Sequence, residues 1–191
     1  MRLLRGMVLG MALAAGGAGA QEVWDLDALM AGMARVHGES AHFVELKYVR
    51  MLTAPIRATG TLTYTAPDKL EKITLTPAPE TIRLDGGTLT GMRADGEEFS
   101  VDIGSHEDVA ALVEGIRSTL AGDLATLRRY YEIAFSGDRD QWRIDLKPKT
   151  GRVREKVVRI RVQGRGTAIG AILVEEKDGD RSEMTITPDT P

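Results

Sequence analysis

Cysteine is absent from the chain, and aromatic residues are scarce, with two tryptophans, four tyrosines and three phenylalanines among 191 residues. Without cysteine, the protein can form neither disulfides nor thiolate metal sites, even in an oxidising compartment. There are three histidines, and none is four residues from another or in an H-E-x-x-H setting. Their spacing therefore predicts no metal site.

The motifs of common enzyme classes are missing as well. No G-x-S-x-G nucleophile elbow occurs. The glycines around Gly164-Arg165-Gly166 lie between two strand-like stretches, whereas a dinucleotide-binding loop opens a helix after a strand, so a hairpin turn explains them better. The sequence does not exclude one enzymatic arrangement, a pair of acidic residues on opposite sides of a cleft. We predict that the protein is not an enzyme and needs no cofactor.

No stretch of the sequence has the roughly 20 apolar residues that cross a membrane. The apolar residues 7–15 follow two arginines and precede Ala18-Gly19-Ala20. Basic head, apolar middle and A-x-A end are the parts of a secretory signal peptide, with a retained signal anchor as the alternative. We predict a signal peptide over residues 1–20, cleavage near Ala20, export to the periplasm and a single domain over residues 21–191.

Positive charge is not in excess either. The chain carries 25 basic and 28 acidic residues, and the predicted cleavage removes two arginines and no acid. An acidic exported protein is a poor partner for nucleic acid. One segment differs, because eight basic residues and a single acid, Glu155, lie between Lys147 and Arg165.

Arg159 and Arg161 in this basic segment alternate with Val158, Ile160 and Val162. In a strand, this alternation places the arginines on one face and the aliphatic residues on the other. A solvated outer face is one interpretation. A docking strip for an anionic partner or a lipid head group is the other hypothesis.

Two kinds of periodicity organise the chain. Apolar residues at spacings of three and four predict an amphipathic helix over residues 24–37, capped by Asp25 or Asp27 and ended by Gly38. A second helical region is predicted over 106–131, with Ser105 and Asp108 in a capping-box arrangement. Runs rich in Thr, Val, Ile and Tyr between Pro or Gly turns predict strands at 42–50, 59–65, 69–76, 80–85, 88–94, 97–103, 141–147, 153–163, 167–177 and 181–187.

Strands that follow one another through tight turns pair as an antiparallel sheet, and the helices must then lie on one face of it. The predicted fold class is therefore α+β.

Several short motifs follow one another over nearly the whole exported chain. They are Phe43-Val44-Glu45 with Leu52 and Pro55, Gly60-Thr61-Leu62-Thr63-Tyr64, Ala66-Pro67-Asp68-Lys69-Leu70, Ile82-Arg83-Leu84-Asp85-Gly86, Leu120-Ala121-Gly122-Asp123 with Leu127, and Trp142-Arg143-Ile144-Asp145-Leu146-Lys147-Pro148. Each motif is weak alone, but their order resembles the outer-membrane lipoprotein carrier (LolA) family. The sequence looks closest to a divergent LolA-related branch that accompanies aryl polyene and glycolipid-type pathways.

The resemblance implies a curved antiparallel half-barrel sheet with helices as a lid over one face. It also implies a cavity for a lipid or acylated molecule, of lipoprotein or glycolipid/aryl polyene type. Such a carrier shuttles its cargo between membranes and meets membrane-bound donor and acceptor proteins. A non-transporting periplasmic binding or sensor module on the same scaffold is the alternative.

One position departs from the family. The lipoprotein carriers have an arginine before the proline of the second strand motif, where it helps latch the lid, and this chain has Ala66 before Pro67. The standard latch and a lipoprotein cargo are therefore not implied, and Arg57 is a candidate substitute.

The walls of such a cavity are aliphatic and aromatic side chains, because each buried CH₂ of an acyl chain contributes about 0.8 kcal/mol. The predicted ligand-binding residues are Leu62, Tyr64, Leu70, Ile82, Leu84, Trp142, Ile144, Leu146, Ile160 and Met184. The predicted lid residues are Leu112, Val113, Ile116 and Leu120. The same side chains could instead fill a closed core.

Overall fold

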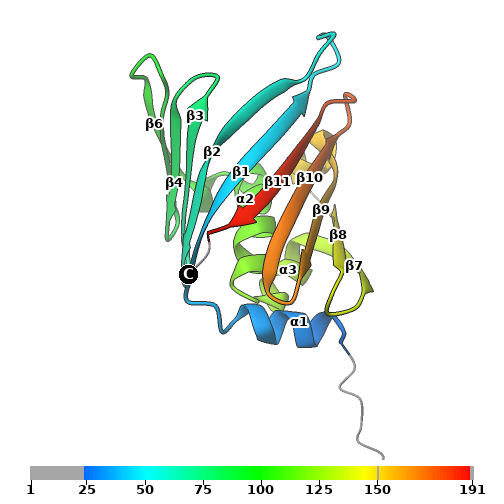
Figure 1. Ribbon diagram of the computed structural model, residues 1–191. Helices are drawn as coiled ribbons and strands as arrows, with labels where there is room; N and C mark the ends of the chain where they lie inside the picture. The colour runs from blue at the N-terminus through cyan, green and yellow to red at the C-terminus, as the bar shows by residue number, and fades with distance from the viewer. Residues whose placement is uncertain (1–23, 150, 190–191) are drawn as a thin grey trace, which may run out of the picture.

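In a computed structural model of the protein, eleven strands of the described chain form one continuous antiparallel sheet with helices on one of its faces (Figure 1). The structure describes residues 24–149 and 151–189, so the predicted signal peptide and its cleavage site lie outside the described residues. The predicted α+β fold, a curved open antiparallel sheet with helices over one face, is confirmed.

The first six strands precede the helical region, and five more follow it. The strands are β1 (Gly38–Tyr48), β2 (Ile56–Thr65), β3 (Lys69–Thr76), β4 (Glu80–Asp85), β5 (Thr88–Met92), β6 (Glu98–Asp102), β7 (Tyr131–Gly137), β8 (Trp142–Pro148), β9 (Val157–Arg165), β10 (Ala168–Glu176) and β11 (Arg181–Pro188). The helices are α1 (Leu26–Met33), the short 3₁₀ helix η1 (Ile103–Ser105), α2 (Glu107–Leu120), α3 (Leu124–Tyr130) and α4 (Gly151–Lys156). Among the described residues, no helix is long and apolar enough to cross a membrane.

The strand order is β6-β5-β4-β3-β2-β1-β11-β10-β9-β8-β7. Each half of the sheet is a meander of sequential antiparallel strands, with α4 inserted between β8 and β9. The two halves join where β1 pairs with β11, with Phe43 opposite Ile186. Because side chains alternate between faces, this register aligns inward-facing residues across all the strands. The sheet thus has one continuous inner face toward the helices.

Helix α1 is shorter than predicted. Asp25 caps it as expected and accepts a hydrogen bond from the Ala28 backbone N–H at 2.9 Å. The helix ends at Met33, and Gly38 is already the first residue of β1. Met33 is buried, because α1 packs its apolar face against the sheet and the other helices.

All ten predicted strands overlap observed ones, but β7 was missed and part of one predicted strand is helical. Tyr131, the last residue of the predicted helical region over 106–131, instead begins β7, where Tyr131 and Ile133 lie opposite Pro148 and Leu146 of β8. Residues 153–156, predicted as strand, belong to α4. The missed strand, β7, is the edge strand of the second half-sheet.

The predicted capping box at the start of α2 is wrong. Ser105 lies in η1, and its hydroxyl donates to the Asp102 carboxylate at 2.8 Å. His106 occupies the N-cap position of α2 without a side-chain hydrogen bond. The 3₁₀ turn places Ser105 before the helix, out of capping position.

Buried apolar residues form two clusters of unequal size. The larger one packs the helices on strands β7 to β10 and contains Leu29, Met30, Met33, Ala111, Leu127, Tyr131, Trp142, Ile144, Leu146, Val153, Val157, Ile160, Val162 and Ile169. The smaller one joins Leu84 of β4, Ile103 of η1 and Ala110 of α2. Between these clusters, the inner face of the first half-sheet is only partly covered.

Candidate ligand-binding site

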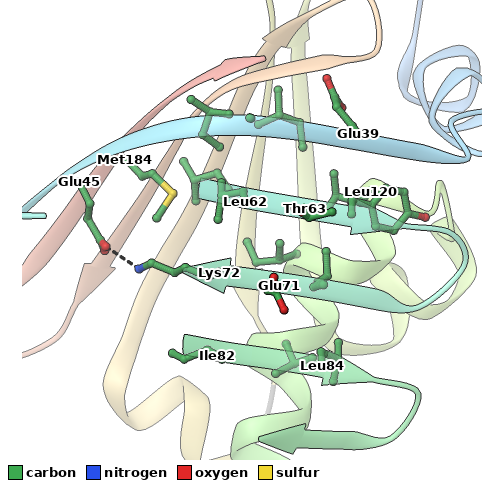
Figure 2. A pocket seen from close by; sticks show the side chains of 18 of the residues that line it. Glu39, Glu45, Leu62, Thr63, Glu71, Lys72, Ile82, Leu84, Leu120 and Met184 are labelled. Atoms are coloured by element: carbon green, nitrogen blue, oxygen red, sulfur yellow. Dashed lines mark hydrogen bonds and ion pairs between the residues drawn. The ribbon is translucent and has the colours of Figure 1, made fainter. Parts of the chain in front are cut away.

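A cavity of about 430 Å³ lies between α2 and the inner face of the sheet. Strands β1 to β5, β10 and β11 contribute to its wall, and α2 forms the opposite side. Figure 2 shows Leu62, Ile82, Leu84 and Met184 around this space, with Leu120 of α2 nearby. Most of the lining side chains are aliphatic, so the cavity is suited to an apolar guest.

The strand register explains why these residues meet. Leu62 of β2 lies opposite Ala41 of β1, and Leu70 of β3 lies opposite Leu84 of β4. Each of the four lines the cavity. Most inward positions that line the cavity on these strands hold aliphatic residues, so their alternation builds a largely apolar wall.

Ten of the predicted ligand-binding and lid residues lie together around this cavity. They are Leu62, Tyr64, Leu70, Ile82, Leu84 and Met184 from the sheet and Leu112, Val113, Ile116 and Leu120 from α2. Leu112 is also 41% exposed, so it lies where the cavity meets solvent. Their contact with a bound ligand stays a prediction.

The other four predicted wall residues do not line the cavity. Trp142, Ile144, Leu146 and Ile160 are each at most 1% exposed and belong to the larger packed cluster. Helices α1 and α3 cover this half of the inner face with side chains such as Leu29 and Leu127. The prediction failed here because the inward positions of both half-sheets look alike in sequence.

The prediction also missed residues that line the cavity from β10 and β11, namely Ile169, Ile172, Val174, Ser182 and Ile186. Ile172 and Val174 are two residues apart in a segment predicted as strand, so the period of two could have identified them.

Three polar side chains from distant parts of the sequence meet in the cavity wall. Glu45 of β1 pairs with Lys72 of β3, with 2.6 Å between Oε2 and Nζ, and Ser182 of β11 donates to the other carboxylate oxygen. The Lys72 ammonium also lies 5.0 Å from the centre of the Phe43 ring. Burial opposes ionisation of Glu45, but the hydrogen bonds from Lys72 and Ser182 outweigh it and lower the pKa of this carboxyl group. The cluster is therefore an ion pair at neutral pH.

Glu39 lines the cavity from the same strand, six residues before Glu45. Among the described residues, no side chain forms an ion pair or hydrogen bond with it, and burial raises the pKa of its carboxyl group. Glu39 and Glu45 thus lie on one face of β1, but their surroundings raise the pKa of Glu39 and lower the pKa of Glu45.

The basic segment is not a free strip of positive charge. Arg161 binds Asp145 of β8 at 2.8 Å, and Arg159 binds Glu175 of β10 at 2.6 Å. Acids on the neighbouring strands thus supply counter-charges for these two arginines. The geometry therefore favours the solvated outer face over the docking hypothesis.

The alternation of inward and outward residues predicted for β9 is wrong at Val158. A register irregularity between β9 and β10 leaves Val157 buried and Val158 45% exposed. The strict alternation predicted from Val158 onward therefore holds only for the residues after it, where Ile160 and Val162 are buried.

The candidate latch residue Arg57 is exposed at the outer end of β2 and lies opposite Leu46, away from the cavity. Arg117 of α2, the helix that faces the cavity, pairs with Glu114 at 2.6 Å and is mostly buried. Burial disfavours its charge, but Glu114 and Asp123 outweigh that effect, and the pKa of Arg117 is raised.

Comparison with protein families identifies the fold. A family model described as outer membrane lipoprotein carrier protein LolA-like matches residues 18–187. The chain belongs to the LolA-like family. This is a family of periplasmic proteins whose fold serves binding and carriage rather than catalysis.

Solved structures similar to this LolA-like protein share little sequence with it. They include a LolA superfamily protein from Nitrosomonas europaea (TM-score 0.46, 10% identity, covering 87% of this chain and 94% of that one). A DUF1329 family protein from Desulfovibrio piger has a TM-score of 0.47 and 10% identity, covering 85% and 89%. The MucA/MucB complex of Pseudomonas aeruginosa has a TM-score of 0.43 and 9% identity, covering 85% of this chain and 56% of that one. No curated protein sequence matches this chain.

Proposed function

We propose that this LolA-like protein binds a lipid or acylated molecule in the cavity between α2 and the first half-sheet and carries it across the periplasm. The cavity itself is the observation that carries this proposal. Its volume of about 430 Å³ falls in the range of small-molecule sites, and its walls are mostly aliphatic. Burial of an acyl chain there contributes about 0.8 kcal/mol per CH₂, which supports binding without any catalytic group.

The position of α2 supports a role as a lid. The α2 side chains that line the cavity, such as Ile116 and Leu120, are apolar. Apolar contacts are non-directional, so α2 can shift and exchange them for contacts with a ligand. The proposal includes membrane-bound donor and acceptor proteins that load and unload the cavity.

The sequence of residues 1–20 supports the proposed periplasmic location. We propose that residues 1–20 are a signal peptide, and N-terminal sequencing of the cellular product tests this directly. A mature protein that starts within two residues of Gln21 is expected. An intact Met1 in a membrane fraction would contradict export as a soluble carrier.

The test of ligand binding uses a fluorescent fatty-acyl probe and two neighbouring variants of β2. Leu62→Glu places a carboxylate in the cavity and should abolish probe binding, because burying an unpaired charge is costly. Thr61→Glu is the matched control, because adjacent strand residues point to opposite faces, and it should bind like the parent. Circular dichroism should show that both variants keep their structure. A parent that binds no probe and copurifies with no lipid would refute the proposal.

A second candidate function is a binding or sensor module that holds an acylated ligand without releasing it. Transfer of the probe between two vesicle populations distinguishes the two functions. A carrier should speed transfer in proportion to protein concentration, whereas a sensor should bind the probe and leave the transfer rate unchanged.

A further inference from the structure

The polar cluster of Glu45, Lys72 and Ser182 lies in the wall of an otherwise aliphatic cavity. In the strand register, Lys72 stands between Leu62 of β2 and Ile82 of β4, and both of these line the cavity. Figure 2 shows the Glu45–Lys72 pair bordered by Leu62, Ile82 and Met184. A ligand that fills the space between these apolar residues therefore touches the ion pair.

Lys72 retains hydrogen-bonding capacity in this position. Its ammonium has three N–H donors, and among the described residues Glu45 is the one side-chain acceptor bound to it. The side chain is 27% exposed, so the ammonium is neither fully hydrated nor sealed within the wall. A ligand oxygen beside Lys72 can accept one of the remaining hydrogens.

The charge around Lys72 determines whether a charged or an uncharged head group can bind beside it. Lys72 is the one basic side chain among the described lining residues, and Glu45 neutralises it. Glu39 adds a second carboxyl group to the same face of β1, and Glu71 of β3, which also lines the cavity, is paired with Arg83. An anionic head group would approach Lys72 only by also approaching Glu45, and it would lose its hydration without a free cation to compensate. A neutral ester or hydroxyl has no such penalty and can accept from Lys72.

We propose that the cavity selects acyl lipids with an uncharged, oxygen-bearing head group, of the acylglycerol type, and that Lys72 binds this head group. The proposal rests on the proposed function, because it assumes that the acyl chain occupies the aliphatic part of the cavity. Free fatty acids and phosphate-bearing lipids of the same chain length are then the disfavoured class.

The experiment measures displacement of a bound fluorescent fatty-acyl probe at pH 8, below the concentrations at which the competitors form micelles. The competitors are monopalmitoylglycerol, palmitate and palmitoyl lysophosphatidic acid, which share one acyl chain and differ in head-group charge. Monopalmitoylglycerol should displace the probe at a concentration at least tenfold lower than either anion. Equal or better displacement by palmitate would overturn the proposal.

Two variants of the ion pair test whether it causes the selectivity, and a third variant outside the cavity is the control. Lys72→Met should raise the displacing concentration of monopalmitoylglycerol about tenfold, whereas Lys69→Met, which removes an exposed lysine from the same strand, should change nothing. Glu45→Gln leaves the Lys72 charge uncompensated and should shift the preference toward palmitate. Because Glu45→Gln predicts a gain of anion binding, it keeps the proposal testable if Lys72→Met folds poorly.

The outcomes separate this proposal from the proposed function. If all three lipids displace the probe equally from the parent and both variants, the carrier function stands and the head-group selectivity is wrong. If no acyl compound displaces the probe, the cavity does not bind acyl chains and both proposals fall.

Discussion

The Tyr131 hydroxyl donates a hydrogen bond to the carbonyl oxygen of Ala111 at 2.7 Å and so joins the first residue of β7 to α2. Burial raises the pKa of Tyr131, which keeps this donor protonated. Gly115 of α2 permits the approach, because a Cβ there would lie 2.9 Å from the Tyr131 hydroxyl oxygen. One side of α2 is thus held by a buried directional bond, while the other faces the cavity.

Tyr131→Phe should destabilise the protein by about 1 kcal/mol, since it removes this hydrogen bond and preserves the ring packing. Urea unfolding measures the change. The variant should also bind an acyl probe faster, because α2 is less restrained. Tyr130→Phe on the neighbouring residue is the control and should match the parent in both measurements. Identical stability of the two variants would show that the bond does not anchor α2.

The larger part of the fold could be predicted from local sequence patterns, and the failures have specific causes. Hairpin turns and β-branched runs located ten strands, because both signals are local. Strand β7 was missed because Tyr131 continues the apolar spacing of Leu124 and Leu127, so one residue fits both a helix and a strand. Tertiary pairing with β8 decides between the two.

The candidate site was predictable only in part, because long-range strand pairing decides which residues face the cavity. The stripe of Leu112, Ile116 and Leu120 follows from helical spacing alone. The meeting of Glu45, Lys72 and Ser182 does not, since it joins residues up to 137 positions apart through three strands. Likewise, nothing local distinguishes Ile144 from Leu62; the cover provided by α1 makes one a core residue and leaves the other in the cavity.

Gly122→Ala should destabilise the protein by more than about 2 kcal/mol, because a steric clash adds to the cost of a left-handed alanine. Gly122 has φ +67° and lies at the junction of α2 and α3, where a Cβ would come within 2.2 Å of the Met30 carbonyl oxygen in α1. The backbone of α1 would have to move away. Gly166→Ala is the matched control, because its φ is +54° and nothing lies within 4 Å of the added Cβ. It should cost only the left-handed conformation, about 1 kcal/mol. Equal losses in thermal unfolding would show that α1 does not pack tightly on this junction.

Arg161→Glu should destabilise the protein by about 2 kcal/mol, because it replaces a charge-assisted hydrogen bond to Asp145 with repulsion between two carboxylates. This expectation differs from that of a free basic strip, in which charge reversal would leave stability unchanged. Arg57→Glu, on an exposed arginine of the outer face, is the control and should change stability by less than about 0.5 kcal/mol. Chemical denaturation at low and high salt compares them, and unchanged stability of Arg161→Glu would contradict the pairing.

Glu39 and Glu45 should give opposite pH dependence to the stability of the protein. The pKa of Glu45 is lowered by its hydrogen-bond partners, so its contribution is complete above its ordinary pKa of about 4.3 and is lost as the pH falls through the lower value of the folded state. The pKa of Glu39 is raised by burial, so the folded state holds the proton longer than the unfolded state does. Ionisation of Glu39 therefore lowers stability progressively as the pH rises from about 4.3 through the folded-state pKa.

Glutamine substitutions separate the two effects, because glutamine keeps the shape of the side chain and does not titrate. At pH 7, Glu45→Gln should be less stable than the parent and Glu39→Gln more stable. At pH 3, the Glu39→Gln difference should vanish and the Glu45→Gln difference should shrink, since the parent carboxyl groups then become protonated. Urea unfolding at pH 3, 5 and 7 provides the three free energies for each protein. A Glu39→Gln variant that is less stable than the parent at pH 7 would mean that this carboxylate has a stabilising partner in the cavity, and that its charge, like that of Glu45, is part of the wall.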